Sequence, residues 1–137
     1  MLLPLDGRNI AYDLVGPETG QVVCMTHSLA SDGGMWTEQV PPLLQAGFRV
    51  LRIDMRGHGG SGPVSGDYTM SALAADVAAV LDALAMVHVH YIGLSIGGML
   101  GQAFALEPVP SVLHVRRRKA DDRFSIPLAH DVPCAEA

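Results

Sequence analysis

Ser95 lies between Gly93 and Gly97, at a point where the sequence changes character within a few residues. Residues 88–94 contain the β-branched and aromatic types that favour a buried strand. After Gly97, apolar residues recur at the spacing of a helix. We therefore predict a strand, a very tight turn and a helix, with Ser95 at the corner between them.

The sharpness of this turn would make Ser95 a suitable nucleophile. The central residue of such a turn is strained, and glycines on either side remove Cβ atoms that would collide. The hydroxyl is then lifted clear of the backbone at a helix N-terminus, where free amides and the helix dipole can stabilise an oxyanion. The alternative is a serine that only caps the helix in a glycine-rich connection. The strand before it and the helix after it favour the nucleophile.

The elements around this turn indicate an α/β fold. We predict a hairpin over residues 1–15, strands over 22–26, 48–53 and 111–115, and helices over 36–45 and 69–84, the last capped by Ser71. Strands that alternate with helices indicate a parallel sheet covered on both faces. The loops that begin at His27, Asp54 and Gly93 would then leave the carboxyl ends of strands, where the reactive groups of such sheets gather.

Composition narrows the class of protein. The chain has 137 residues, 49% of them hydrophobic, which predicts a single domain with an ample core. A formal net charge of −5 argues against nucleic acid or an anionic membrane as a partner. Two cysteines do not make a disulfide framework, and no secretory leader or membrane-spanning run is visible, so we expect a cytoplasmic protein. We expect no metal and no cofactor.

Three motifs together resemble the α/β-hydrolase family. Residues 93–97 (GLSIG) resemble the nucleophile elbow, and residues 26–29 (THSL) are similar to the oxyanion loop after the family's third strand. Residues 54–61 (DMRGHGGS) resemble the D-x-R-G-H-G-x-S loop. Order and spacing agree across residues 1 to about 115. Residues 1–115 are thus predicted to be the core of one domain, with residues 116–137 as an atypical tail.

The resemblance implies both a fold and an activity. The fold would be a mostly parallel sheet flanked by helices, shortened to about six strands, with no obvious cap domain. Ser95 would be the nucleophile, and the amides of Leu29 and Ile96 would form the oxyanion hole. An epoxide hydrolase or dehalogenase would need aspartate at position 95. The His-Ser-Leu…Trp variant of this loop, with its tryptophan at position 36, most resembles enol-lactonases, esterases and hydrolases that cleave carbon–carbon bonds of ring-cleavage products.

Other polar residues in the motifs have structural interpretations. In matching family motifs, His27 and His58 support loops by hydrogen bonds and are not the catalytic base. Asp54 and Arg56 are expected to form an ion pair or a loop brace. The glycines of residues 57–62 also fit a dinucleotide fingerprint, but no helix is predicted to open there, which argues against that interpretation.

The end of the sequence departs from the family pattern. Only 42 residues follow Ser95, and relatives of this kind are about twice as long. The family order of serine, acid and histidine leaves Asp121 or Asp122 as the acid and His130 as the base. An extended segment of eight or nine residues spans ~25–30 Å, so a return of His130 to Ser95 is feasible. The alternative is that His130 is a surface residue.

A shortened sheet would have consequences for assembly. Its unpaired edge and uncovered apolar face predict a homo-oligomer, with a histidine that a neighbouring chain could supply. Five of the nine basic residues lie in 116–123, a run that we interpret as solvated surface in preference to a nucleic-acid patch. The main hypothesis is a serine hydrolase that cleaves small carboxylic esters or lactones through an acyl-enzyme. The alternatives are a carbon–carbon bond hydrolase and a catalytically silent assembly module.

Overall fold

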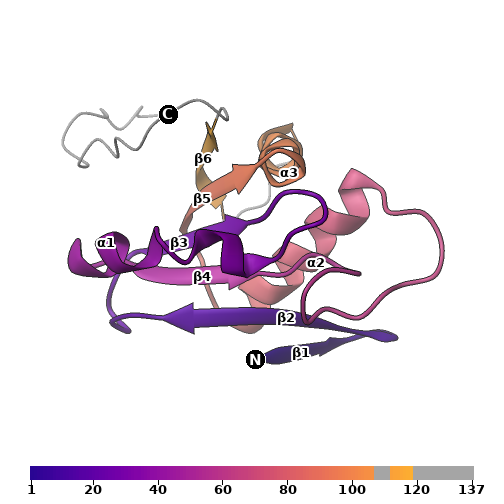
Figure 1. Cartoon of the computed structure of the whole chain (residues 1–137), viewed down its shortest axis with the longest axis horizontal. Coiled ribbons are helices and arrows are strands. Elements are labelled where there is room, and N and C mark those ends of the chain that lie inside the picture. Colours follow the sequence, from indigo (N-terminus) through magenta and orange to yellow (C-terminus); the bar gives the residue numbers. More distant parts are fainter. Residues whose placement is uncertain (107–111, 119–137) are drawn as a thin grey trace.

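The computed structural model of the chain describes residues 1–106 and 112–118 (Figure 1). Its strands are β1 (Leu2–Leu5), β2 (Arg8–Val15), β3 (Val22–Thr26), β4 (Arg49–Ile53), β5 (Val89–Leu94) and β6 (Val112–Arg118). The helical elements are the 3-10 turn η1 (Gly33–Trp36) and the helices α1 (Val40–Gln45), α2 (Met70–Ala83) and α3 (Ile96–Leu106). No helix within the described ranges is both long and apolar enough to span a bilayer.

These strands form one sheet in the order β1-β2-β4-β3-β5-β6. The pairs β1–β2 and β2–β4 are antiparallel, whereas β4, β3, β5 and β6 run parallel. Thr26 at the end of β3 lies opposite both Ile53 and Gly93. The three loops that carry the sequence motifs therefore leave the sheet side by side, which confirms the predicted α/β architecture with about six strands.

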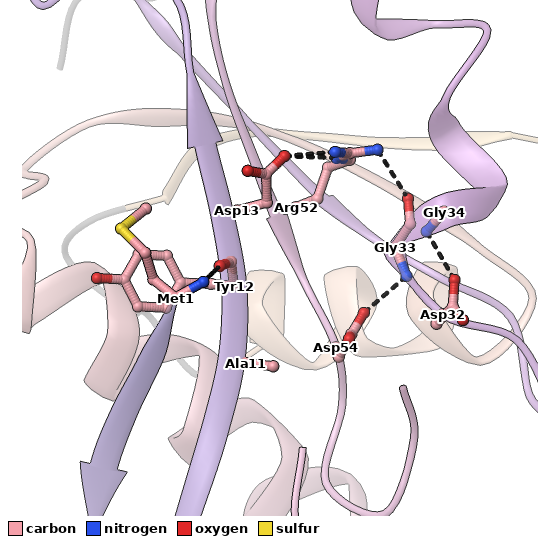
Figure 2. Close-up of a pocket in the computed structure, with 9 residues that line it drawn as sticks. All are labelled: Met1, Ala11, Tyr12, Asp13, Asp32, Gly33, Gly34, Arg52 and Asp54. Atoms are coloured by element: carbon pink, nitrogen blue, oxygen red, sulfur yellow. Dashed lines mark hydrogen bonds and ion pairs between the residues drawn. The ribbon is translucent and has the colours of Figure 1, made fainter. Parts of the chain in front are cut away.

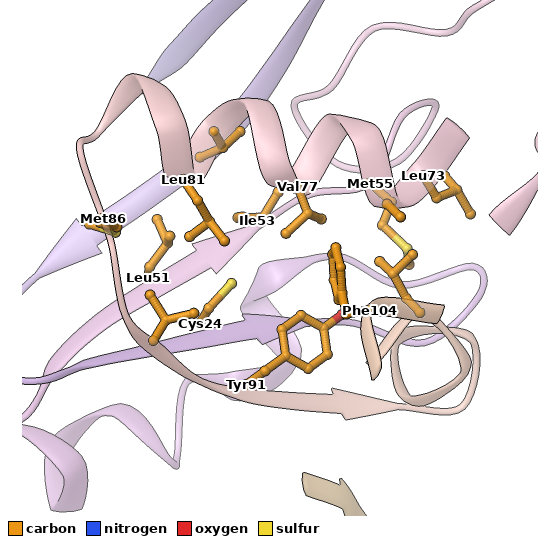
Figure 3. Close-up of a cluster of buried hydrophobic side chains, with 14 of the residues drawn as sticks. Cys24, Leu51, Ile53, Met55, Leu73, Val77, Leu81, Met86, Tyr91 and Phe104 are labelled. Carbon is orange, nitrogen blue, oxygen red and sulfur yellow. The ribbon is translucent and has the colours of Figure 1, made fainter. Parts of the chain in front are cut away.

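Helices cover both faces of this sheet, because alternate residues of the central strands are apolar in both directions. In Figure 1, α1 lies on one side of β3 and β4, and α2 lies on the other. Cys24 and Leu51 belong to the larger core beneath α2 and α3, whereas Val23 and Val50 pack with Trp36 and α1 on the opposite face. Figure 3 shows the larger core, with side chains of α2 directed toward the strands.

Two helix starts differ from the prediction. Thr69, not Ser71, caps α2: its backbone is extended, and its hydroxyl accepts a hydrogen bond of 3.1 Å from the amide of Ala72. Ser71 already lies inside the helix. The helix predicted over residues 36–45 is divided into η1 and α1. Pro41 and Pro42 lie in the first turn of α1, where a missing N–H leaves no intrahelical hydrogen bond unmade, so the helix begins at them.

The strand predicted over residues 111–115 is present as β6. It pairs with β5 and continues to Arg118, so the basic run begins on a strand. Residue 111 lies outside the described part of the chain.

Candidate active site

Ser95 occupies the corner between β5 and α3. Leu94 is the last residue of β5, and Ile96 is the first of α3. The backbone of Ser95 has φ of +53°, a left-handed conformation that costs a non-glycine residue ~1–2 kcal/mol. Ser95 is exposed, and its carbonyl accepts the amide of Met99 at 3.0 Å, so the helix starts directly behind it. The predicted sharp turn with an outward serine is therefore present.

Both flanking glycines are required by close backbone contacts. A Cβ at position 93 would lie 2.2 Å from the carbonyl oxygen of Gly97, because α3 folds back over the end of β5. A Cβ at position 97 would lie 2.6 Å from the carbonyl oxygen of Thr26 and 2.8 Å from that of His27. The first turn of α3 thus packs directly on the end of β3. Its free amides lie beside the loop in which Leu29 was expected to contribute to an oxyanion hole.

His27 is buried and braces the loops on either side of this contact. Its Nδ1–H donates to the carbonyl of Ser28 at 2.8 Å, and its Nε2 accepts the amide of Met55 at 2.9 Å. This pattern requires the neutral ring, and burial lowers its pKa below the usual histidine value. Both nitrogens are occupied by backbone groups, which confirms that His27 supports loops and is not placed to act as a base.

The loop that follows His27 is exposed at Leu29 and Ala30. Ala30 has φ of +57°, a second left-handed residue close to the site. Leu29 is 65% exposed, and the amide of Ser28 donates to the sulfur of Met35 at 3.3 Å. This side-chain contact fixes the loop against η1 without using the amide of Leu29.

The carboxylate of Asp54 is a loop brace. It accepts the amide of Gly33 at 2.7 Å and the amide of Gly60 at 2.9 Å. The expected ion pair between Asp54 and Arg56 is wrong, because the Arg56 guanidinium turns toward α2 and contacts Asp76 at 2.5 Å. His58 donates from Nδ1 to the carbonyl of Arg56 at 3.1 Å, as expected of a loop support.

Sequence reasoning missed Asp76. This buried carboxylate lies on the apolar face of α2 and binds two guanidinium groups, those of Arg8 on β2 and Arg56 in the loop after β4. A charged residue beside Leu73 and Val77 on a core-facing stripe was the available signal. Its partners could not be named from sequence spacing.

A separate hollow of about 250 Å³ lies between β2, β4 and η1 (Figure 2). Its polar lining is already paired: Asp13 binds Arg52, and Asp32 accepts the amide of Gly34 at 2.7 Å. Ser95 does not line this hollow. It therefore gives no reason to place the reaction there.

The remaining candidates can be placed only in part. Asp121, Asp122 and His130 lie outside the described residues, so their roles as acid and base beside Ser95 stay predictions. Among the described side chains, none forms a hydrogen bond with the Ser95 hydroxyl. The glycine run at residues 57–62 belongs to a loop, and the next helix begins only at Met70, so the dinucleotide interpretation lacks its helix.

Comparison with known proteins agrees with this geometry. A family model described as alpha/beta hydrolase fold matches residues 21–116. RutD of Variovorax paradoxus, a candidate carbamate hydrolase, is 33% identical over 127 residues, covering 92% of this chain and 47% of RutD. The 3-oxoadipate enol-lactonase 1 of Acinetobacter baylyi is 35% identical over 99 residues, covering 72% of this chain and 36% of the enol-lactonase. A hydrolase structure from Pseudomonas aeruginosa PA01 is 39% identical with a TM-score of 0.77, covering 82% of this chain and 42% of that one.

The chain belongs to the α/β-hydrolase family, as its motifs indicated. It spans less than half the length of the relatives described above. Epoxide hydrolases and non-heme chloroperoxidases also match, so membership of the family does not by itself fix the reaction.

Proposed function

We propose that this chain carries the nucleophile half of a serine hydrolase that cleaves small carboxylic esters or lactones. One observation carries the proposal: Ser95 is exposed at φ of +53° on a turn whose helix packs against the end of β3. A hydroxyl in that position can reach a carbonyl carbon, while amides beside it can donate hydrogen bonds to the developing oxyanion. Serine at position 95 also argues against the aspartate-dependent chemistry expected of an epoxide hydrolase.

In the proposed reaction, the Ser95 oxygen is first the nucleophile and later the leaving group. Its Oγ adds to the carbonyl carbon while a histidine takes the hydroxyl proton, and the amides of Leu29 and Ile96 stabilise the oxyanion. The carbon–oxygen bond to the leaving group then breaks, and that oxygen receives the proton. Water hydrolyses the acyl-enzyme by the same steps and releases the acid. His130 is the proposed base, with Asp121 or Asp122 orienting it.

Likeness to relatives supports the proposed substrate class. An enol-lactonase is among the matched proteins, and a lactone is an internal ester that opens by the same acyl transfer. The alternative is cleavage of a carbon–carbon bond in a ring-cleavage product, which would start at the same serine. Parallel assays of an aryl ester, a lactone and a dienoate separate the two.

The test replaces Ser95 and compares it with a serine elsewhere. Ser95→Ala should lower kcat/KM for p-nitrophenyl acetate by more than ~10³-fold while the folded spectrum is kept. Ser71→Ala removes an exposed serine of α2 and should change kcat/KM by no more than about twofold, since it lies outside the proposed machinery. Retained turnover in Ser95→Ala would contradict the proposal.

A second measurement addresses the base. A fluorophosphonate probe should label Ser95 in the folded chain, and His130→Asn should slow that labelling by ~10²-fold or more. Absence of labelling in a folded sample would instead favour the catalytically silent assembly module.

A further inference from the structure

Two buried hydroxyls form a series of hydrogen bonds that ends in the first turn of α3, two residues after the proposed nucleophile. The hydroxyl of Tyr91 on β5 donates to the carbonyl of Gly97 at 3.1 Å, in the first turn of α3. The hydroxyl of Thr26, at the end of β3, lies 2.5 Å from the same Tyr91 oxygen. The Tyr91 hydroxyl has a single proton and donates it in the hydrogen bond to the Gly97 carbonyl. Thr26 must therefore be the donor in its hydrogen bond with the Tyr91 oxygen. The chain runs from β3 through β5 to the start of the helix.

Packing alone does not account for these hydroxyls. The Tyr91 ring stacks edge-on against Phe104 at 5.3 Å and lies within the apolar core beneath α2 (Figure 3). A phenylalanine would satisfy that environment, and a buried hydroxyl destabilises the fold unless it is bonded. Thr26 is fully buried and Tyr91 is 1% exposed, so water cannot compete for either group. Burial also raises the pKa of Tyr91 well above its usual value, which keeps the phenol neutral and able to donate.

The final acceptor of these hydrogen bonds, the Gly97 carbonyl, lies close to the proposed oxyanion donor in the sequence. Gly97 lies two residues after Ser95 and one after Ile96, whose amide is the proposed oxyanion donor. A Cβ at position 97 would lie 2.6 Å from the Thr26 hydroxyl, so helix and strand are in direct contact there. The peptide groups of one helical turn move together, because each turn is held by its own hydrogen bonds. Fixing the Gly97 carbonyl therefore fixes the direction of the Ile96 amide.

We propose that Tyr91, oriented by Thr26, is a positioning residue. It holds the first turn of α3 in the position from which the Ile96 amide can donate a hydrogen bond to the oxyanion. This inference rests on the proposed function, and it assigns a role to two buried hydroxyls that do not touch the substrate. The oxyanion exists only along the reaction path, so loss of either hydroxyl should lower kcat more than it changes KM.

The kinetic test removes and restores one hydroxyl at a time in the full chain. Tyr91→Phe and Thr26→Val should each lower kcat for p-nitrophenyl acetate by about tenfold with KM within about twofold, because misplacement of a donor costs less than its ~10²–10³-fold loss. Thr26→Ser keeps the hydroxyl and should stay within about threefold of wild type. Tyr12→Phe, a partly buried tyrosine on β2, is the matched control and should leave kcat unchanged.

A second measurement separates this inference from the proposed function. Amide hydrogen exchange at residues 99–101, whose amides close the first turn of α3, should become faster in Tyr91→Phe and Thr26→Val than in wild type and Thr26→Ser, whether or not the chain turns over an ester. Wild-type protein without Ser95-dependent turnover would contradict the proposed function and leave the exchange comparison to decide the positioning role. Unchanged exchange in both variants would overturn the inference, as would an unchanged kcat in both.

Discussion

The Arg56 guanidinium meets the carboxylate of Asp76 at 2.5 Å, and both side chains are buried. Asp76 also binds Arg8, so one carboxylate ties α2 to β2 and to the loop after β4. That loop carries the amide of Met55, which His27 accepts. The ion pair thus supports the loop that contains His27 and Leu29 indirectly, through the hydrogen bond between Met55 and His27.

Replacing Asp76 should destabilise the chain strongly. Asp76→Ala leaves two guanidinium groups without their partner, and breaking a buried pair typically costs ~3–5 kcal/mol of unfolding free energy. Asp82 is an exposed aspartate on the same helix, and Asp82→Ala is the matched control. It should change the unfolding free energy by no more than about 0.5 kcal/mol. Urea unfolding followed by circular dichroism measures both. Equal stabilities of the two variants would show that the buried network contributes nothing.

Gly97 should not tolerate even one added carbon. Gly97→Ala places a Cβ within 2.8 Å of three oxygen atoms of Thr26 and His27, two of them on the backbone. The helix must then move away from β3, at a cost of ~1–3 kcal/mol in unfolding free energy and with loss of Ser95 labelling. Gly62→Ala, whose Cβ would have no atom closer than 3.9 Å, is the control. Normal labelling of Gly97→Ala would mean that the close contact is not required.

Local patterns in the sequence predicted most of the architecture. The strand–turn–helix around Ser95 was predictable because glycines and the change of periodicity act within a few residues. The cap of α2 was misplaced by two residues, because Thr69 and Ser71 are both acceptable caps and only backbone geometry separates them.

Contacts between distant residues were not predictable in this way. Asp76 meets Arg8 and Arg56 across sequence separations of 68 and 20, and no periodicity relates such positions. The same holds for the Tyr91 hydroxyl, whose strand position predicts a buried ring but not its bond to Gly97. Oligomerisation and the roles of Asp121, Asp122 and His130 stay predictions. Light scattering on a purified sample checks the first.

Ala85 offers a test of the fold away from the elbow. It follows the last turn of α2 with φ of +52°, the left-handed position that glycine favours after a helix. Ala85→Gly should raise the unfolding free energy by ~0.5–1 kcal/mol, because it relieves strain without removing a buried contact. Ala75 is a solvent-exposed residue in the middle of the same helix, and Ala75→Gly should lower the unfolding free energy by ~1 kcal/mol. Thermal unfolding of the pair gives opposite shifts, and shifts of the same sign would contradict the assigned backbone conformation.

The buried imidazole of His27 should make stability depend on pH. Burial lowers its pKa in the folded chain, and nearby His58 acts in the same direction. Together they outweigh the hydrogen bond to the Ser28 carbonyl and the charges of Asp54 and Asp32, which raise the pKa. In the unfolded chain the ring titrates near pH 6.5, so below that pH the unfolded state takes up a proton that the folded state refuses.

The unfolding free energy should therefore be constant above about pH 7 and fall on acidification, by no more than ~1.4 kcal/mol per pH unit for one proton. The fall should continue through pH 6.5 until the lowered pKa of His27 is reached. His27→Gln should flatten this dependence while also reducing stability, because the amide cannot repeat both backbone hydrogen bonds. His88→Gln removes an exposed imidazole and is the matched control. Urea titrations between pH 5 and pH 8 decide the matter: an equal slope in wild type and His27→Gln would show that His27 is not the group responsible.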